Sequence, residues 1–161
     1  MSDSYELTDV DSFTPMAMGI PGARTFFLLV ARDATQISFK CEKQHVEALA
    51  NALSSLLGDV ESTAEPIASQ HPSQTFASPA PAWTVGSIAL GMDESEGRIF
   101  VVLEEVTNDE DSGASARFGM TVAQAQRFVV QGTELVAAGR PGCVLCGSPI
   151  DVLGYRCACF N

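Results

Sequence analysis

Four cysteines stand close together near the end of the chain, in the pattern Cys143-x-x-Cys146 and Cys157-x-Cys159. Thiolates at such spacing are typical ligands of zinc, which proteins often hold in tetrahedral sites made of four cysteines. So short a stretch cannot build a hydrophobic core of its own, and a metal ion would have to stabilise it. The sequence therefore predicts one structural zinc ion, bound by all four of these cysteines in a small ribbon.

Three other chemistries could use these cysteines. A redox Cys-x-x-Cys usually opens a helix after a strand, whereas Pro149 follows this pair too closely. Two disulfide bonds would need an oxidising compartment. A catalytic zinc ion needs an open coordination position, which four thiolates would not leave. Structural zinc is the interpretation that the spacing favours.

The fifth cysteine, Cys41, lies four residues before His45, which places both on one face of a helix. A neighbouring histidine can activate a cysteine as a nucleophile. A helical Cys–His spacing alone does not make a site, however, and a lone cysteine is commonly a small core residue. We expect Cys41 to lie in the core. His71 is expected to be solvated, and it could bind metal only if its segment reached the cysteine cluster.

The segment Gly19-Ile-Pro-Gly-Ala-Arg24 could cradle an anion with backbone N–H groups and the Arg24 guanidinium. It lacks the glycine spacing and the lysine of a P-loop and does not open a helix, so a turn that leads into a strand is favoured. The neighbouring carboxylates of Glu104 and Glu105 point to opposite faces of a strand and cannot form an acid–base pair. The sequence predicts no catalytic residues.

The first half of the chain is predicted to form three strands and a helix. Residues 24–31 form an apolar run and residues 35–40 alternate between apolar and polar side chains, which together predict a hairpin. Apolar residues at helical spacing over 41–57 predict an amphipathic helix that ends at a glycine. Residues 5–13 are interpreted as a first strand, and prolines and glycines mark 15–22 as a loop.

The same order of elements is predicted for the second half. Strands are expected over 83–91, 98–106 and 114–119, followed by a helix after Thr121. Gln124 completes a capping box with Thr121. A constant offset aligns the two helices and the strands before them, so we expect an internal duplication.

Three parts follow from this order. Residues 1–139 are expected to form one duplicated domain and residues 140–161 a zinc-ribbon-like tail. Within the domain, 5–58 is the first half, 59–82 is a linker rich in Ser, Ala and Pro, and 83–139 is the second half.

The predicted fold class is α+β. Duplicated βββα halves are expected to form one antiparallel sheet of about six strands, with both helices on one face of the sheet. Burial between the sheet and the helices would form the core, which is expected to include Phe26, Phe39, Val101, Leu103 and Phe118.

The chain is acidic, with a formal net charge of −11, which opposes binding to nucleic acid or to an anionic membrane surface. Hydrophobic residues make up 46% of the 161 residues, which favours a folded protein. No apolar run approaches the roughly 20 residues of a membrane-spanning helix. The first residues lack the basic and apolar regions of a signal peptide, so we expect a cytoplasmic location, where cysteines favour metal over disulfides.

Several short motifs resemble those of an uncharacterised actinobacterial family, catalogued as domain of unknown function 3090. The resemblance covers nearly the whole chain and implies no known activity. It also implies a gene association with a histidine-phosphatase-like protein and a lipid-kinase-like protein. The motifs are Tyr5-Glu-Leu, Val10-Asp-x-Phe13, Pro21-Gly-x-Arg-Thr-Phe26, Glu42-Lys-Gln44, Trp83-x-Val-Gly86, Ala89-Leu-Gly91, Gly139-Arg-Pro141, Cys143, Cys146-Gly147, Pro149-Ile-Asp151, Gly154, Cys157 and Asn161.

The cysteine cluster departs from the pattern of that family at one position. The family usually has histidine where this chain has Tyr155, and a tyrosine phenol, which ionises near pH 10, is a poor zinc ligand at neutral pH. This chain has the additional Cys159 instead, so the resemblance implies that the fourth ligand moved from position 155 to Cys159. Tyr155, His71 and a water molecule are the alternatives for that fourth position.

Two functions remain open at the level of the sequence. The first is a non-enzymatic binding or adaptor protein with structural zinc and an unidentified protein partner. The second is an enzyme or sensor that acts on a phosphorylated small molecule, with Arg24 as the residue that contacts phosphate. Nucleic acid and membranes are not expected as partners.

Overall fold

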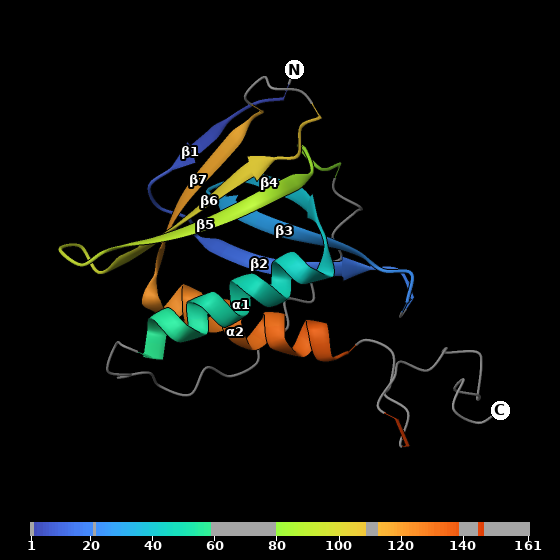
Figure 1. Cartoon of the computed structure of the whole chain (residues 1–161). Helices are drawn as coiled ribbons and strands as arrows, with labels where there is room; N and C mark the ends of the chain where they lie inside the picture. Colours follow the sequence, from blue (N-terminus) through green and yellow to red (C-terminus); the bar gives the residue numbers. More distant parts are fainter. Residues whose placement is uncertain (1, 21, 59–79, 109–112, 139–144, 147–161) are drawn as a thin grey trace.

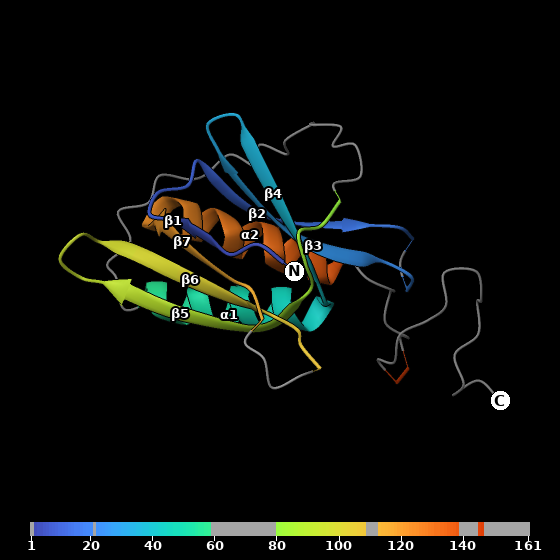
Figure 2. The ribbon, with the colours of Figure 1, turned by 90° about the horizontal axis from the view of Figure 1, so that it is seen from above.

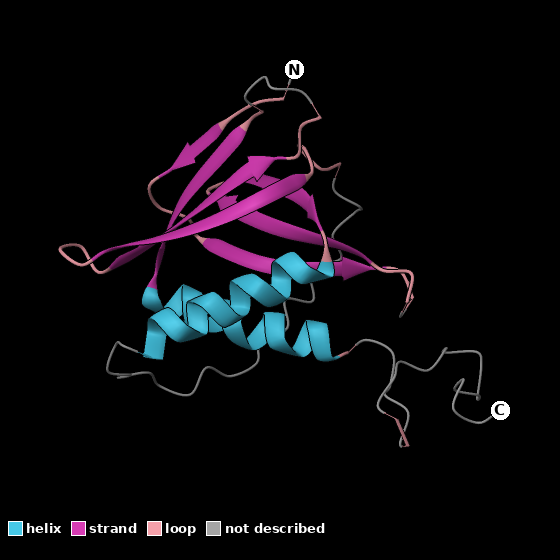
Figure 3. Cartoon of the chain, viewed as in Figure 1, coloured by secondary structure: helices cyan, strands magenta, loops and turns pink. Residues whose placement is uncertain are grey.

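The structure is a computed structural model that describes residues 2–20, 22–58, 80–108, 113–138 and 145–146. Its elements within these ranges are β1 (Tyr5–Leu7), β2 (Ser12–Met18), β3 (Thr25–Arg32), β4 (Thr35–Cys41), α1 (Lys43–Gly58), β5 (Val85–Asp93), β6 (Arg98–Glu105), β7 (Ser115–Thr121) and α2 (Val122–Ala137). Together the strands form a layer over the two helices, as Figures 1 and 3 show. The mixed α+β class is therefore confirmed.

The strands form two sheets, so the prediction of a single antiparallel sheet is wrong. One sheet has four strands in the order β1-β7-β6-β5, and the other has three in the order β2-β3-β4. The pairing of β1 with β7 is parallel, with Tyr5 opposite Ala116. A bend in the N-terminal segment divides the sheets: the Val10 N–H donates to Gly119 O at 3.1 Å, and the Asp11 N–H donates to Ala31 O at 2.8 Å. The chain thus leaves one sheet and joins the other.

The same bend corrects the first predicted strand. Residues 5–13 do not form one strand, because Tyr5–Leu7 pair with β7 and the next strand begins at Ser12. This second strand, β2, continues to Met18 through the region predicted as a loop, with Pro15 opposite Leu28. Proline is tolerated there because β2 pairs with β3 only, so the missing N–H can face away from the ladder.

The two sheets meet where the end of β4 lies beside the residues that lead into β5. Lys40 and Thr84 form an isolated parallel bridge, and the Lys40 N–H donates to Trp83 O at 3.0 Å. The Ala82 N–H donates to Ser38 O at 2.8 Å, so the end of the predicted linker lies against β4. Residues 59–79 lie outside the described residues, and the linker itself stays a prediction.

Both helices lie on the same side of the strands and pack against each other, as Figures 1 and 2 show. Their close approach depends on small residues: a Cβ added at Gly132 would lie 3.3 Å from the Ala50 Cβ. The predicted capping box of α2 is confirmed, because the Gln124 N–H donates to Thr121 Oγ1 and the Thr121 N–H donates to Gln124 Oε1. The Gln124 side chain also donates to Val10 O at 2.7 Å, which ties the start of α2 to the bend.

One core cluster takes side chains from both halves of the chain. All five predicted core residues are buried, and the Phe39 ring lies 4.5 Å from the Trp83 ring and 5.7 Å from the Phe118 ring, centroid to centroid. Burying such a side chain contributes roughly 2–3 kcal/mol, and aromatic pairs add to this. β2, β3 and β4 precede α1 as β5, β6 and β7 precede α2, with the short β1 in addition at the start, and the internal duplication itself stays a prediction.

Candidate functional site

The predicted zinc ligands fall almost entirely outside the described residues. Cys143, Cys157 and Cys159 lie there, as do the alternative ligands His71 and Tyr155. Cys146 is described; it is exposed and follows the exposed Leu145 in a turn. Within the described ranges there is no group of three or more His, Cys, Asp or Glu residues that could hold a metal ion. The zinc-ribbon-like tail therefore stays a prediction.

Cys41 is a core residue, as predicted. Its side chain belongs to the hydrophobic core, with 4% of its surface exposed. Burial, and to a smaller extent the negative charge of Glu42, raise the pKa of its thiol to about 12. His45 accepts a hydrogen bond at Nδ1 from the Glu42 N–H at 3.1 Å, which places this nitrogen at the start of α1. The thiol is therefore protonated at neutral pH and cannot act as a nucleophile, since the thiolate is the reactive form.

The buried thiol gives a testable prediction. A thiol whose pKa is raised from 9.0 to about 12 by folding stabilises the fold fully below pH 9. This contribution is lost as the pH rises through the folded value, because the unfolded chain then releases a proton that the folded chain keeps. We expect alkylation at about pH 8 to leave Cys41 unmodified in the folded protein and to modify it in denaturant. Peptide mapping by mass spectrometry measures both, and rapid modification of Cys41 without denaturant would contradict its place in the core.

Arg24 contacts the end of a helix. Its guanidinium donates to Leu135 O in the last turn of α2 at 3.1 Å and lies 5.0 Å from the centre of the Phe26 ring. A cation in this place complements the negative end of the helix dipole. The preceding segment is a turn, in which the Ala23 N–H donates to Ile20 O and Gly19 and Gly22 have φ angles of 103° and 90°. These contacts give Arg24 a structural role.

The carboxylates of Glu104 and Glu105 have separate partners, in agreement with the prediction that they do not form a pair. Glu104 accepts a hydrogen bond from the Ser87 hydroxyl at 2.5 Å. Glu105 accepts hydrogen bonds from the Ser2 hydroxyl and from the Ala114 N–H, and these bonds lower the pKa of its carboxyl. Glu105 is therefore kept ionised, which does not suit a general acid.

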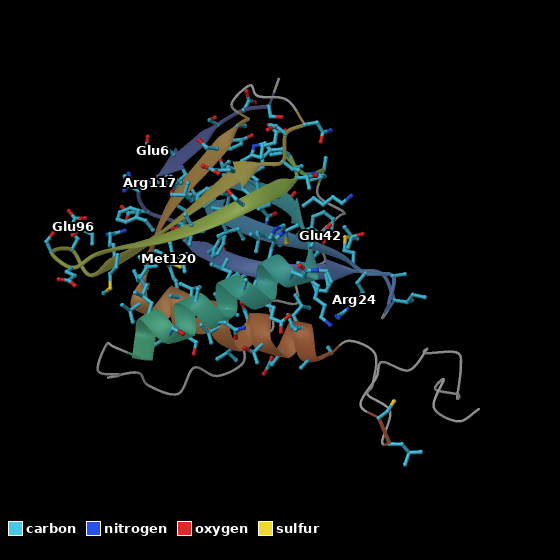
Figure 4. The ribbon with its side chains drawn as sticks, viewed as in Figure 1. Glu6, Arg24, Glu42, Glu96, Arg117 and Met120 are labelled. Atoms are coloured by element: carbon cyan, nitrogen blue, oxygen red, sulfur yellow. The ribbon has the colours of Figure 1, made fainter. Side chains whose placement is uncertain are left out.

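A different surface stands out, on the side of the four-stranded sheet that faces away from the helices. Cross-strand pairing places Glu6, Arg117, Val102 and Ala89 in one row across β1, β7, β6 and β5. The Arg117 guanidinium lies 4.3 Å from the centre of the Phe100 ring and 3.6 Å from a Glu6 carboxylate oxygen. Figure 4 shows Glu6 and Arg117 together on this side of the sheet. We call it the outer face.

Two glycines flank Phe100 in the next row of the outer face. A Cβ on Gly119 would lie 3.0 Å from the Phe100 ring, whereas a Cβ on Gly91 would meet nothing within 4 Å. The open side forms a shallow hollow of about 700 Å³ that is wide open to solvent. Its lining comes from β5, β6, β7 and the β5–β6 turn, namely Ala89, Leu90, Gly91, Met92, Asp93, Glu94, Ser95, Phe100, Val102 and Arg117.

This hollow was not predicted from the sequence. Gly91 looked like one position of an alternating strand, and Phe100 and Arg117 stood in two separate strands. The register that joins them depends on pairing between strands and is not visible in the local pattern. The one local signal was the pair of small residues Ala89 and Gly91 on one face of a strand, since a strand glycine can mark a place where another group approaches closely.

The lining of the hollow could contact both apolar and charged groups of a ligand or partner. An aromatic ring and bare backbone provide apolar surface, Arg117 provides hydrogen-bond donors, and Asp93 and Glu94 provide negative charge at the rim. Hydrogen bonds from the Ser95 hydroxyl and from the Ser95 and Glu96 N–H groups lower the pKa of Asp93, so its charge persists at acidic pH. Small polar groups around an apolar floor are typical of a recognition surface.

Comparison with known proteins gives one match. A family model described as a protein of unknown function (DUF3090) matches residues 5–157, which includes Cys143, Cys146 and Cys157 and ends two residues before Cys159. No curated protein and no solved structure matches the chain. In the described ranges, neither helix is long and apolar enough to cross a membrane.

Proposed function

We propose that this chain, which belongs to the DUF3090 family of proteins of unknown function, is a non-enzymatic binding or adaptor protein that holds a protein partner on its outer face. The observation that carries the proposal is the hollow beside Phe100, which opens over the bare backbone of Gly91. An apolar side chain of a partner fits this place, because it would cover the ring without displacing any side chain of the sheet.

The charges around the hollow suggest the chemistry of the partner. Asp93 and Glu94 stand at the rim and Arg117 stands beside the ring, so a basic group next to the inserted side chain would meet the acidic turn. The net charge of −11 on the chain also favours a basic partner surface, because opposite potentials speed association. It disfavours nucleic acid and anionic membranes for the same reason.

The contacts of the other candidate residues support binding over catalysis. The Cys41 thiol is buried and protonated, and Glu104 and Glu105 hold separate structural hydrogen bonds. Arg24, the residue on which a phosphate site would depend, already donates to the end of α2. Action on a phosphorylated small molecule is therefore the weaker hypothesis.

The tail completes the proposal. One structural zinc ion would be held by Cys143, Cys146, Cys157 and Cys159, whose thiolates are the donors that zinc prefers in structural sites. Such a site needs reduced cysteines, so it supports a cytoplasmic location. The duplicated domain of residues 1–139 and the metal-stabilised tail of residues 140–161 would then each offer one surface to a partner.

A charged residue on the outer face is expected to abolish partner binding. Val102 lies in the centre of the face, next to Arg117 and Ala89, and a Val102→Glu variant would replace apolar contact surface with a carboxylate that pairs with Arg117. We expect the variant to retain at least about tenfold less of a partner than the immobilised wild-type protein does, because the contact loses an apolar side chain and Arg117 is no longer available to the partner. Quantitative mass spectrometry of the retained proteins measures the loss.

The matched control is Thr133→Glu, which adds the same charge to the exposed side of α2. Equal retention by wild type, Thr133→Glu and Val102→Glu would contradict the outer face as the binding surface.

A separate measurement tests the hypothesis that the protein acts on a phosphorylated small molecule. A thermal shift with a phosphorylated metabolite that Arg24→Ala removes, at unchanged stability of the unliganded variant, would favour that hypothesis.

A further inference from the structure

Among the described strands, none lies beside the outer edge of β5 over most of its length. β5 is the last strand of its sheet, and β4 bridges it only at Thr84. A bulge at Gly86 follows, and from there to Asp93 the described strands provide no further partner. The backbone N–H and C=O groups on this side can therefore pair with another strand.

Other strand edges in the described residues carry the usual protection. β1 is three residues long and includes Glu6, β2 includes Pro15 and packs against α2, and the middle of β4 is covered by Ala82 and Trp83. β5 differs because it has no charged residue and no proline from Val85 to Met92. The chain has 20 acidic residues, so a strand of this length without charge is unusual in it. The absence of charge indicates that this edge pairs with another strand.

The helix beneath this edge is equally free of charge. α1 contacts β5 and runs below it in Figures 1 and 2. After Glu47 it has no charged residue up to Gly58, and the exposed positions in this part are small: Ala48, Asn51, Ala52, Ser54 and Ser55. A helix with small side chains can approach another helix closely, so the strand edge and the helix face form one uncharged strip.

Charges of opposite sign lie at the two ends of the strip. Lys40 lies beside its start at Thr84, and Lys43, the only other lysine of the chain, follows at the start of α1. Glu42 lies between the two lysines, and Glu104 and Glu105 lie on the opposite side of β5, in β6. At the other end, the β5–β6 turn contains Asp93, Glu94 and Glu96. Figure 4 shows Glu96 in the β5–β6 turn at one end of the sheet and Glu42 just before α1, far from that turn.

We propose that a second copy of this chain pairs along β5, with the two β5 strands antiparallel and related by a twofold axis. Residues that oppose each other must project from the same face, so the axis passes at a residue. Ala89 and Leu90 lie in the middle of the stretch from Gly86 to Asp93, and we place the axis at one of them. With the axis at Ala89, Glu94 of one copy comes level with Thr84 of the other, where Lys40 takes the position beside the strand, and with the axis at Leu90, Glu96 does. Either register places the acidic turn of each copy beside the lysines of its partner, and this happens twice in the dimer.

The proposal extends beyond partner binding on the outer face. It joins two four-stranded sheets into one continuous sheet and brings α1 beside α1 of the second copy. Ala89 would meet Ala89 of the second copy with the axis at Ala89, or Gly91 of the second copy with the axis at Leu90, so small residues meet near the axis on the outer face. The two hollows then adjoin, with a Phe100 ring on each side.

Charge reversal tests the proposal. Sedimentation of the wild-type protein from micromolar to millimolar concentration is expected to give a dimer. Lys40→Glu with Lys43→Glu, and separately Glu94→Lys with Glu96→Lys, are each expected to raise the dissociation constant of the dimer by about tenfold or more. These two variants change the net charge in opposite directions, so a general effect of net charge cannot weaken both.

The decisive experiment measures an equimolar mixture of the two variants. Each copy would then meet charges of opposite sign at both ends, so an equimolar mixture is expected to form a heterodimer about as stable as the wild-type dimer. This restoration also shows that both variants are folded. Wild-type protein that stays at the mass of one chain at every concentration overturns the proposal. So does a dimer that either charge reversal leaves unchanged, or a mixture that fails to restore it.

Discussion

Replacing Gly119 by alanine is expected to lower the free energy of unfolding by about 3 kcal/mol. Gly119 lies in β7 under the bend between β1 and β2, where a Cβ would be 2.1 Å from Thr8 O. Since Thr8 O is a backbone atom, the bend would have to move. The Val10 N–H donates to Gly119 O at this crossing and the Gln124 side chain holds the Val10 carbonyl, so a shift would disturb both hydrogen bonds. Thermal unfolding measures the loss, at about 2–4 °C per kcal/mol for a chain of this size.

Gly91→Ala is the matched control for this substitution. Both glycines lie opposite Phe100, one on each side, but a Cβ on Gly91 meets no atom within 4 Å. Alanine at this position is expected to leave stability unchanged or slightly higher, because it lowers the entropy of the unfolded chain. Equal unfolding temperatures of the two variants would show that the bend does not cross β7 closely. Larger residues at position 91 would fill the hollow and should be avoided in this comparison.

Elements with a local cause were predicted well from the sequence. The apolar run that became β3, the alternation in β4 and the helical stripe of α1 each follow from which side of one segment is buried. The capping box of α2 involves Thr121 and Gln124, three residues apart, so its geometry is also local. The boundaries of these elements differed from the predicted ones by one or two residues.

The division into two sheets was not predictable in the same way, because its cause lies between distant residues. Thr8 to Asp11 contain no glycine or proline, and the bend there is fixed by hydrogen bonds to Gly119 and Ala31. Pro15 pointed to a loop, since proline removes a backbone donor. It lies instead in β2, a strand with a sheet neighbour on one side only, where this donor is not needed.

The candidate site shows the same limit more sharply. Phe100, Arg117 and Gly91 come from three strands, and only the register of β5, β6 and β7 brings them together. Single-strand patterns distinguish the inner face from the outer face, but they do not give the neighbour across the sheet. Arg24 is the opposite case: its sequence context suggested an anion, whereas the last turn of α2, more than a hundred residues away, provides its hydrogen-bond acceptor.

The largest effect of all is expected in the tail when the zinc ion is removed. We expect one zinc ion per chain, bound about 2.3 Å from each of four sulfurs. The tail has few apolar side chains, so the metal should supply most of its folding free energy, on the order of 10 kcal/mol by comparison with small zinc domains. The body has its own core, with Phe39 and Phe118 fully buried. A chelator is therefore expected to make the tail sensitive to proteases while the circular dichroism of the body persists.

Cysteine variants separate this zinc site from the other thiol of the chain. Cys143→Ser is expected to abolish zinc binding, and Cys159→Ser to weaken it less, because a water molecule can occupy a terminal coordination position. Cys41→Ala is the matched control and should keep one zinc ion, since Cys41 belongs to the core. Affinity should increase as the pH rises through the thiol range, because binding requires thiolates and releases protons. Native mass spectrometry under reducing conditions measures the stoichiometry. A metal-free mass for the wild type would contradict the zinc site, and undiminished binding by Cys159→Ser would identify Tyr155, His71 or water as the fourth ligand.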